Sequence, residues 1–236
     1  MWFMIRITLK SIGIFNIGLA FILIMSAGPV RAEESAPGPV TAPALAQFSP
    51  ENQKKLLAGE AIFEHVISKD PDGKDEGHGR GAVLINRPVE ECFRVFLDLD
   101  QQYKYFPRMT VSRVLGREGN RVRMYKELDF TIFTAKYTHF ITIVPEDFRV
   151  DFITDPKGEN SFKLSAGFFR FVKVDAKTSL LFYEMTRLEI GLKVPGFIRT
   201  YAYTHLSARD LPPIVTNIKK RIESGGRWEK TVTSDR

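Results

Sequence analysis

The order of the predicted secondary-structure elements constrains this chain more than any other feature. From Gly79 to Ser224 the sequence predicts a strand, a short amphipathic helix, about six alternating strands and one long final helix. The links between the strands are short and rich in turn residues, as in Gly116–Asn120 and Asp155–Gly158. Parallel neighbours would need crossovers of about a dozen residues, so these links predict an antiparallel meander.

A sheet of this kind buries one face, and the C-terminal helix is the only sizeable cover that the sequence offers. We therefore expect an α+β fold in which a curved antiparallel sheet wraps around a long C-terminal helix. Curvature in a sheet usually requires a glycine or a bulge. Gly167 is the best candidate, because the apolar alternation changes parity there, from Phe162 and Leu164 to Phe169 and Phe171.

The expected strands share an alternation of apolar and polar residues or a bounding pair of turns. They are Glu60–Ser68, Gly77–Asn86, Met109–Leu115, Arg121–Phe133, Lys136–Val144, Phe148–Thr154, Ser161–Val174 and Leu180–Gly191. The expected helices are Pro50–Ala58, a helix that begins at Pro88, Asp100–Phe106, and Pro195–Ser224, which Pro212-Pro213 interrupts. The helix after Pro88 has one apolar face, formed by Val89, Cys92, Phe93, Phe96 and Leu97.

The first part of the chain has the composition of a targeting segment. Residues 1–32 combine a basic start, an apolar run and Val30-Arg31-Ala32, which is typical of a signal peptide; an uncleaved membrane anchor is the alternative. Residues 33–50, rich in Pro, Ala, Ser and Gly, are expected to form a flexible linker. The folded domain then covers residues 51–226, and residues 227–236 form a polar tail. We expect an exported, periplasmic protein, or one tethered to the inner membrane by its leader.

Charge and cysteine content exclude some classes of protein. The net charge of +6 falls to +3 without residues 1–32, and both signs are interspersed, so we expect no nucleic-acid partner. The single cysteine, Cys92, rules out an internal disulfide, and its place on an apolar helix face predicts a buried thiol rather than a nucleophile. The histidines lack metal-ligand spacing and there is no phosphate-binding or dinucleotide motif, so we expect neither a metal nor a cofactor.

Phenylalanine is abundant, with nineteen residues, and much of it falls on the apolar side of the predicted sheet. These rings would either fill an ordinary core or line a cavity for an apolar ligand. The residues expected to line such a cavity are Phe130, Ile132, Phe152, Phe162, Phe169, Phe171, Phe182, Phe197 and Tyr201.

By the alternation of the predicted strands, three polar residues fall on the same face as these apolar residues. Lys126 alternates with Met124 and Leu128, and Glu184 alternates with Phe182, so both are expected on the apolar side, where an unpaired charge is costly. They would be polar handles for a ligand head group, but the interpretation that we favour is that twist or a bulge turns one or both outward. His139 would be either a third such group, able to act as an acid or base, or a hydrogen-bonded structural histidine, which we favour.

Basic residues gather around the predicted hairpin of the third and fourth strands. They are Arg108, Arg113, Arg117, Arg121 and Arg123. A solvated strand face is the simplest explanation, and contact with anionic lipid head groups at a membrane surface is the alternative.

Two motifs resemble those of a known superfamily. Gly79–Phe93 is similar to its opening strand followed by an Asn-x-Pro-x-Glu helix start, and Leu97–Pro107 is similar to its next stretch, with Asp, Tyr and Phe before a proline. The chain thus resembles the START-like superfamily of helix-grip domains, which includes polyketide cyclases, lipid-transfer domains and coenzyme Q-binding proteins. The likeness covers about Gly59 to Ser224 and implies an apolar cavity between sheet and helix. Its motifs are structural, so they specify fold better than function.

We therefore expect an exported START-like protein, not an enzyme, that binds or carries a hydrophobic small molecule such as a lipid or an isoprenoid. One alternative is a cyclase or dehydratase acting on a polyketide-like substrate, with His139, Glu184 or Tyr201 as the acid or base. The other is a partner-binding module whose cavity is vestigial.

Overall fold

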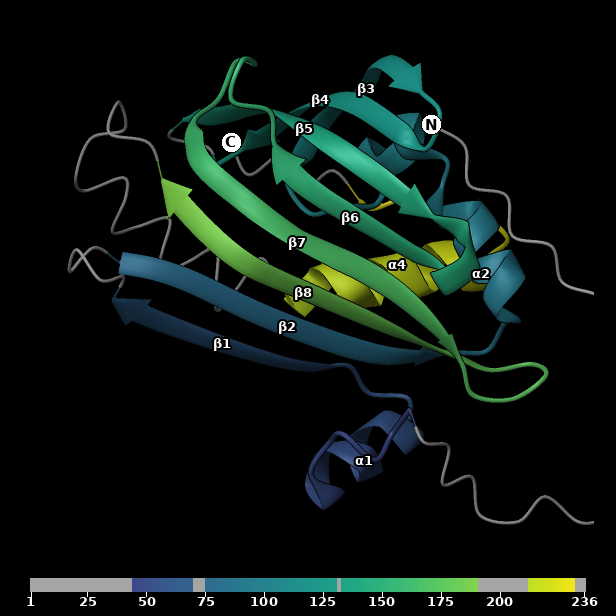
Figure 1. Ribbon diagram of the computed structural model, residues 1–236. Helices are drawn as coiled ribbons and strands as arrows, with labels where there is room; N and C mark the ends of the chain where they lie inside the picture. Colours follow the sequence, from purple (N-terminus) through teal and green to yellow (C-terminus); the bar gives the residue numbers. More distant parts are fainter. Residues whose placement is uncertain (1–43, 70–74, 131–132, 191–211, 232–236) are drawn as a thin grey trace, which may run out of the picture. The chain divides into compact units, whose positions relative to one another are not determined.

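The computed structural model describes residues 44–69, 75–130, 133–190 and 212–231 of the chain. Within them, eight antiparallel strands form one curved sheet in the order β1-β2-β8-β7-β6-β5-β4-β3 (Figure 1). The strands are β1 (Ile62–Lys69), β2 (Asp75–Ile85), β3 (Met109–Glu118), β4 (Arg121–Asp129), β5 (Thr134–Val144), β6 (Arg149–Thr154), β7 (Phe162–Lys173) and β8 (Ser179–Ile190). The predicted antiparallel meander and the α+β class are confirmed.

The helices contact the sheet at different places. They are α1 (Pro50–Leu57), α2 (Val89–Phe96), the 3₁₀ turns η1 (Leu99–Lys104) and η2 (Pro145–Asp147), and α4 (Pro212–Glu223). Helices α2 and α4 contact each other, α2 contacts β7 and α4 contacts β2, so both lie on the same face of the sheet (Figure 1). Of the predicted final helix, only the part from Pro212 onward lies within the described residues.

Local sequence explains where the helices begin. The Ser49 hydroxyl accepts a hydrogen bond from the Asn52 backbone N–H at 3.3 Å, and Pro50 occupies the first turn of α1. Helix α2 follows Pro88 and buries Val89, Cys92, Phe93 and Phe96 against the sheet, as its periodicity predicts.

The thiol of Cys92 is fully buried in this core. Burial raises the pKa of the thiol to about 11, so it stays protonated at neutral pH. A structural role for Cys92 is thereby favoured over a nucleophilic one.

Gly167 lies at an irregularity in the pairing of the sheet. The pairing of β7 with β8 shifts between Ala166 and Gly167, leaving Thr186 as the extra residue on β8. A Cβ atom on Gly167 would lie 2.7 Å from Cζ of Phe152, so only glycine fits this approach of neighbouring strands. The structure thus has a bulge beside Gly167, where the change of parity predicts a glycine or a bulge.

The sheet is apolar on both faces at its β1–β2–β8 end. A large core lies under α2 and α4, and a second cluster lies on the opposite, outer face. The buried members of the outer cluster are Leu45, Leu56, Ile62, Ala82, Leu84 and Leu180. Residues 44–49, predicted to be flexible linker, therefore take part in packing: Leu45 is buried, and the Phe48 ring centroid lies 6.4 Å from that of Phe182.

The start of the predicted polar tail is also held against the domain. The Nζ atom of Lys230 donates hydrogen bonds to the backbone carbonyls of Phe106 at 2.7 Å and Met109 at 2.5 Å. Nη1 of Arg221 donates to the carbonyl of Trp228 at 2.9 Å. The bonds from Lys230 attach the segment after α4 to the chain around the start of β3, and the bond from Arg221 attaches it to α4 itself.

Candidate functional site

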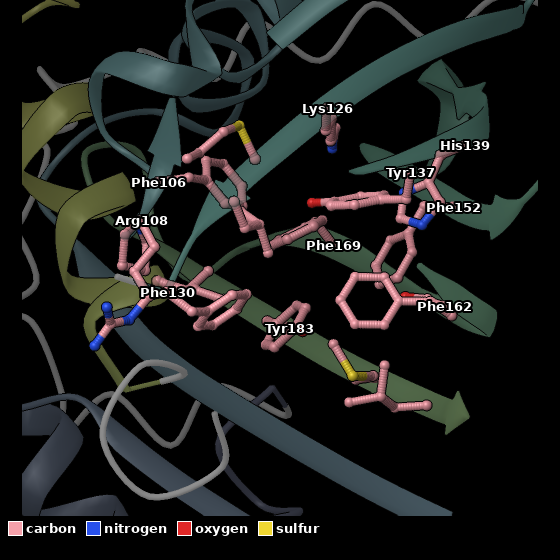
Figure 2. Close-up of a pocket in the computed structure, with 17 residues that line it drawn as sticks. Phe106, Arg108, Lys126, Phe130, Tyr137, His139, Phe152, Phe162, Phe169 and Tyr183 are labelled. Atoms are coloured by element: carbon pink, nitrogen blue, oxygen red, sulfur yellow. The ribbon is translucent and has the colours of Figure 1, made fainter. Parts of the chain in front are cut away.

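A cavity opens between the inner face of the sheet, the loop before β3 and the start of α4. The volume of the cavity is about 100 Å³, which is room for several water molecules. Its described lining is Phe106, Pro107, Arg108, Met109, Lys126, Leu128, Phe130, Tyr137, His139, Phe152, Phe162, Ser165, Phe169, Tyr183, Met185, Leu188 and Ile214 (Figure 2). Residues from six neighbouring strands, β3 to β8, therefore face one space.

Aromatic rings form most of the wall. Phe169 lies among them, with ring centroids 4.7 Å from Tyr183, 5.8 Å from Phe106 and 5.8 Å from Phe152. Phe152, Phe169 and Tyr183 come together because β6, β7 and β8 pair side by side and alternate residues of each strand face inward near these positions, whereas Phe106 comes from the loop before β3. The rings leave space instead of closing the core, which suits an apolar guest.

Three polar side chains interrupt this wall on β4 and β5. Lys126 and Tyr137 are directly opposite in the ladder, and His139 follows on the same face of β5 (Figure 2). Lys126 is only 7% exposed and His139 only 4%. Among the described residues, neither ring nitrogen of His139 has a hydrogen-bond partner. The Lys126 ammonium lies over the Phe106 ring, with Nζ 5.8 Å from the ring centroid.

Burial controls the protonation of this group. It lowers the pKa of the Lys126 ammonium to about 8. Burial, and secondly the charge of Lys126, hold the pKa of His139 well below its usual value, so the imidazole is neutral at pH 7. Burial also raises the pKa of the Tyr137 hydroxyl, which keeps it a neutral donor. The corner thus combines one ammonium with two neutral groups that carry donors.

Neither a protein-family model nor a curated protein sequence matches this chain. Solved structures do match. The Thermus thermophilus protein TTHA0849 aligns with a TM-score of 0.53 and 18% identity, over 61% of this chain and 96% of that protein. The Zhui aromatase/cyclase of Streptomyces sp. R1128 aligns with a TM-score of 0.53 and 13% identity, over 69% and 94%. A STAR-related lipid transfer protein of Xanthomonas axonopodis aligns with a TM-score of 0.50 and 14% identity, over 67% and 98%.

The chain has a START-like fold. The resemblance inferred from the sequence motifs is confirmed at the level of the fold. At these low identities the likeness carries no substrate and no residue role over to this chain. The site must be interpreted from its own side chains.

Four of the residues expected to line the cavity of the START-like fold do so: Phe130, Phe152, Phe162 and Phe169. Phe171 is buried in the adjoining core, with ring centroids 6.3 Å from Phe93 and 5.4 Å from Phe96. Three others of the expected set, Ile132, Phe197 and Tyr201, lie outside the described residues. A role in ligand binding stays a prediction for each residue.

Phe182 and Glu184 lie on the outer face of the START-like sheet, not in the cavity. Phe182 contacts Phe48, and Glu184 is opposite Arg80 of β2. Their alternate neighbours on β8, Tyr183 and Met185, line the cavity instead. The prediction was wrong for Phe182 because the outer face is also apolar here, so alternation did not show which face borders the cavity. The outward position of Glu184 fits the interpretation that we favoured over a polar handle for one or both of Lys126 and Glu184.

The bulge at Thr186 adds to this error. It changes the parity of β8, so Leu188 lines the cavity although Phe182 does not. Tyr183 was missed because the sequence reasoning assigned the parity of Phe182, and not that of Tyr183, to the inner face. Tyr137 was detectable, because it shares a strand face with His139.

The other two expected polar handles, Lys126 and His139, do line the cavity. We favoured a structural His139 held by hydrogen bonds. In the part of the chain that the structure describes, neither of its ring nitrogens has a hydrogen-bond partner, so that interpretation is wrong there. Its ring instead lies 5.3 Å from Phe152 and 4.7 Å from Tyr137, measured between centroids.

Several arginines of the predicted basic cluster are held against the protein surface. The Arg121 guanidinium lies 3.8 Å from the Phe140 ring centroid, and that of Arg113 lies 5.5 Å from Tyr125. Nε of Arg123 donates to the Asp155 carboxylate at 2.7 Å. Contact of this cluster with lipid stays a prediction.

Two further observations concern the described residues alone. No group of three or more His, Cys, Asp and Glu side chains among them is arranged to hold a metal ion. None of their helices is both long and apolar enough to cross a membrane.

Proposed function

We propose that this protein binds and carries a hydrophobic molecule, such as a lipid or an isoprenoid, in the cavity between its curved sheet and α4. The observation that carries the proposal is the space itself: aromatic rings from several strands surround it and do not fill it. Each methylene group that a guest buries there contributes about 0.8 kcal/mol, so a long chain needs few polar contacts. The cavity of about 100 Å³ suits a small guest or one segment of a longer one.

We also propose that the domain is exported to the periplasm. The support is the composition of residues 1–32, with its basic start, apolar run and small residues near position 32. A carrier in that compartment would meet lipids at either membrane. N-terminal sequencing of protein purified from its own host would show whether these residues are removed.

Native mass spectrometry of the full chain, gently extracted from its own host, tests the carrier role. Met185→Trp places a large ring in the cavity, and Ile153→Trp, at an exposed position on β6, is the matched control. We expect the natural protein and the Ile153 variant to retain a bound apolar molecule, and the Met185 variant to lose it. Natural protein that is always empty would contradict the proposal, as would ligand retained in a folded Met185 variant.

One observation favours a second function, cyclisation or dehydration of a polyketide-like substrate. His139 faces the cavity with neither nitrogen hydrogen-bonded to another described residue, as a group awaiting a substrate proton would. Of the other two residues considered for this role, Glu184 lies on the outer face and Tyr201 lies outside the described residues. Turnover of a synthetic poly-β-keto thioester that disappears in His139→Phe, while dye binding persists, would support the enzyme.

A further inference from the structure

One corner of the cavity is charged, and the charge has one sign. Lys126 brings its ammonium to a wall that otherwise consists mainly of aromatic and aliphatic side chains. None of the described lining residues is acidic, and no ion pair to Lys126 is formed among the described residues. An isolated buried ammonium is costly, so a protein that keeps one in a binding cavity gains from a counter-charge that arrives with the ligand.

The neighbours of Lys126 add hydrogen-bond donors to this corner, so it can bind a group that accepts several hydrogen bonds. Tyr137 is its direct partner across the β4–β5 ladder, and Figure 2 shows its hydroxyl and the Lys126 ammonium facing the same space. The neutral imidazole of His139 adds one N–H. A group that accepts several hydrogen bonds and carries negative charge would satisfy all three side chains at once.

We propose that the hydrophobic ligand carries a single carboxylate, which binds the Lys126 ammonium beside Tyr137 and His139 while its apolar part lies among the aromatic rings. This inference rests on the proposed carrier function and names its ligand class. A carboxylate is compact enough for a cavity of about 100 Å³, and its two oxygens accept up to four hydrogen bonds. An amine would meet a like charge, and an alcohol would leave the ammonium without a counter-charge.

A matched series of probes separates these cases. N-Phenyl-1-naphthylamine, a neutral dye, reports occupancy of the cavity in the full chain, and dodecanoic acid, 1-dodecanol and dodecylamine compete for it at pH 7 below their micellar concentrations. We expect dodecanoate to bind at least about tenfold more tightly than dodecanol, in line with the gain from a charge-assisted hydrogen bond, and dodecylamine to bind most weakly.

Two variants assign the preference to Lys126. In Lys126→Met the ratio of the dodecanoate affinity to the dodecanol affinity is expected to fall to about one, while the dodecanol affinity itself changes less than about threefold. Lys173→Met, at an exposed position on β7, is expected to keep the natural ratio.

The outcomes distinguish this inference from the carrier function. Equal binding of acid and alcohol to the natural protein overturns the carboxylate proposal and leaves the carrier intact, and this comparison needs no variant to fold. A preference that survives in Lys126→Met also overturns it. If the dye and all three dodecyl probes fail to bind, the carrier function falls and the carboxylate proposal falls with it.

Discussion

Replacing Lys126 by methionine should stabilise the empty protein. Burial lowers the pKa of this ammonium from 10.5 to about 8. A shift of about 2.5 units corresponds to a penalty of about 3 kcal/mol on the charged folded state, at 1.36 kcal/mol per unit. Methionine fills a similar volume without the charge, so the free energy of unfolding at pH 7 should rise by about 2–3 kcal/mol, or roughly 4–12 °C in Tm for a domain of this size.

The pH dependence of this gain has a definite sign. Because the folded pKa is lower than the unfolded one, the unfolded state binds more protons between about pH 8 and pH 10.5, and the natural protein gains stability as pH rises through that window. Below about pH 8 the penalty is complete. Above about pH 10.5 lysine is neutral in both states, so the advantage of Lys126→Met should vanish.

Urea unfolding at intervals from pH 6 to pH 10, followed by circular dichroism, measures this difference directly. Lys173→Met controls for the loss of a positive charge at an exposed site. A Lys126 variant that is less stable at pH 7, or whose advantage does not shrink with rising pH, would show that the ammonium is paired or solvated in the folded protein. If the gain is found, the same side chain that weakens the empty domain would be the one that binds the ligand, which is a common relation between stability and function.

Three further changes test other parts of the structure. Gly167→Ala should cost about 1–3 kcal/mol in thermal or urea unfolding, because its methyl group would overlap the Phe152 ring. Lys230→Met should increase amide exchange in residues 106–109 and weaken dye binding, since it removes two hydrogen bonds to that loop; unchanged exchange would disprove the link. Arg117→Glu should reduce flotation with vesicles containing phosphatidylglycerol, and equal flotation with neutral vesicles would remove the membrane hypothesis for the basic hairpin.

Alternation in the sequence was informative where one face of a strand is polar. On β4, Val122, Met124 and Lys126 share a parity opposite to Arg121 and Arg123, and the structure buries the first three. The presence of a lysine among the apolar positions was therefore visible without coordinates. That this lysine lacks an ion-pair partner in the described structure was not, because a partner can come from any strand or loop.

On β8 the same reasoning failed. Both faces of this strand are apolar near Leu180, since residues 44–57 cover the outer face and α4 lies on the inner side of the sheet. The bulge at Thr186 then exchanges the faces further along the strand. The local alternation of apolar residues predicts that a side chain is buried, but it does not show which part of the chain covers that side chain.

The amino-acid sequence by itself determined the order of elements, the antiparallel pairing and the bulge beside Gly167, because these follow from periodicity, short turns and the space that one residue occupies. Tertiary structure decided which apolar face borders the cavity, that the rings leave space there, and that Lys126 shares this space with Tyr137 and His139. These properties depend on contacts between segments far apart in the chain, and such contacts leave no local pattern.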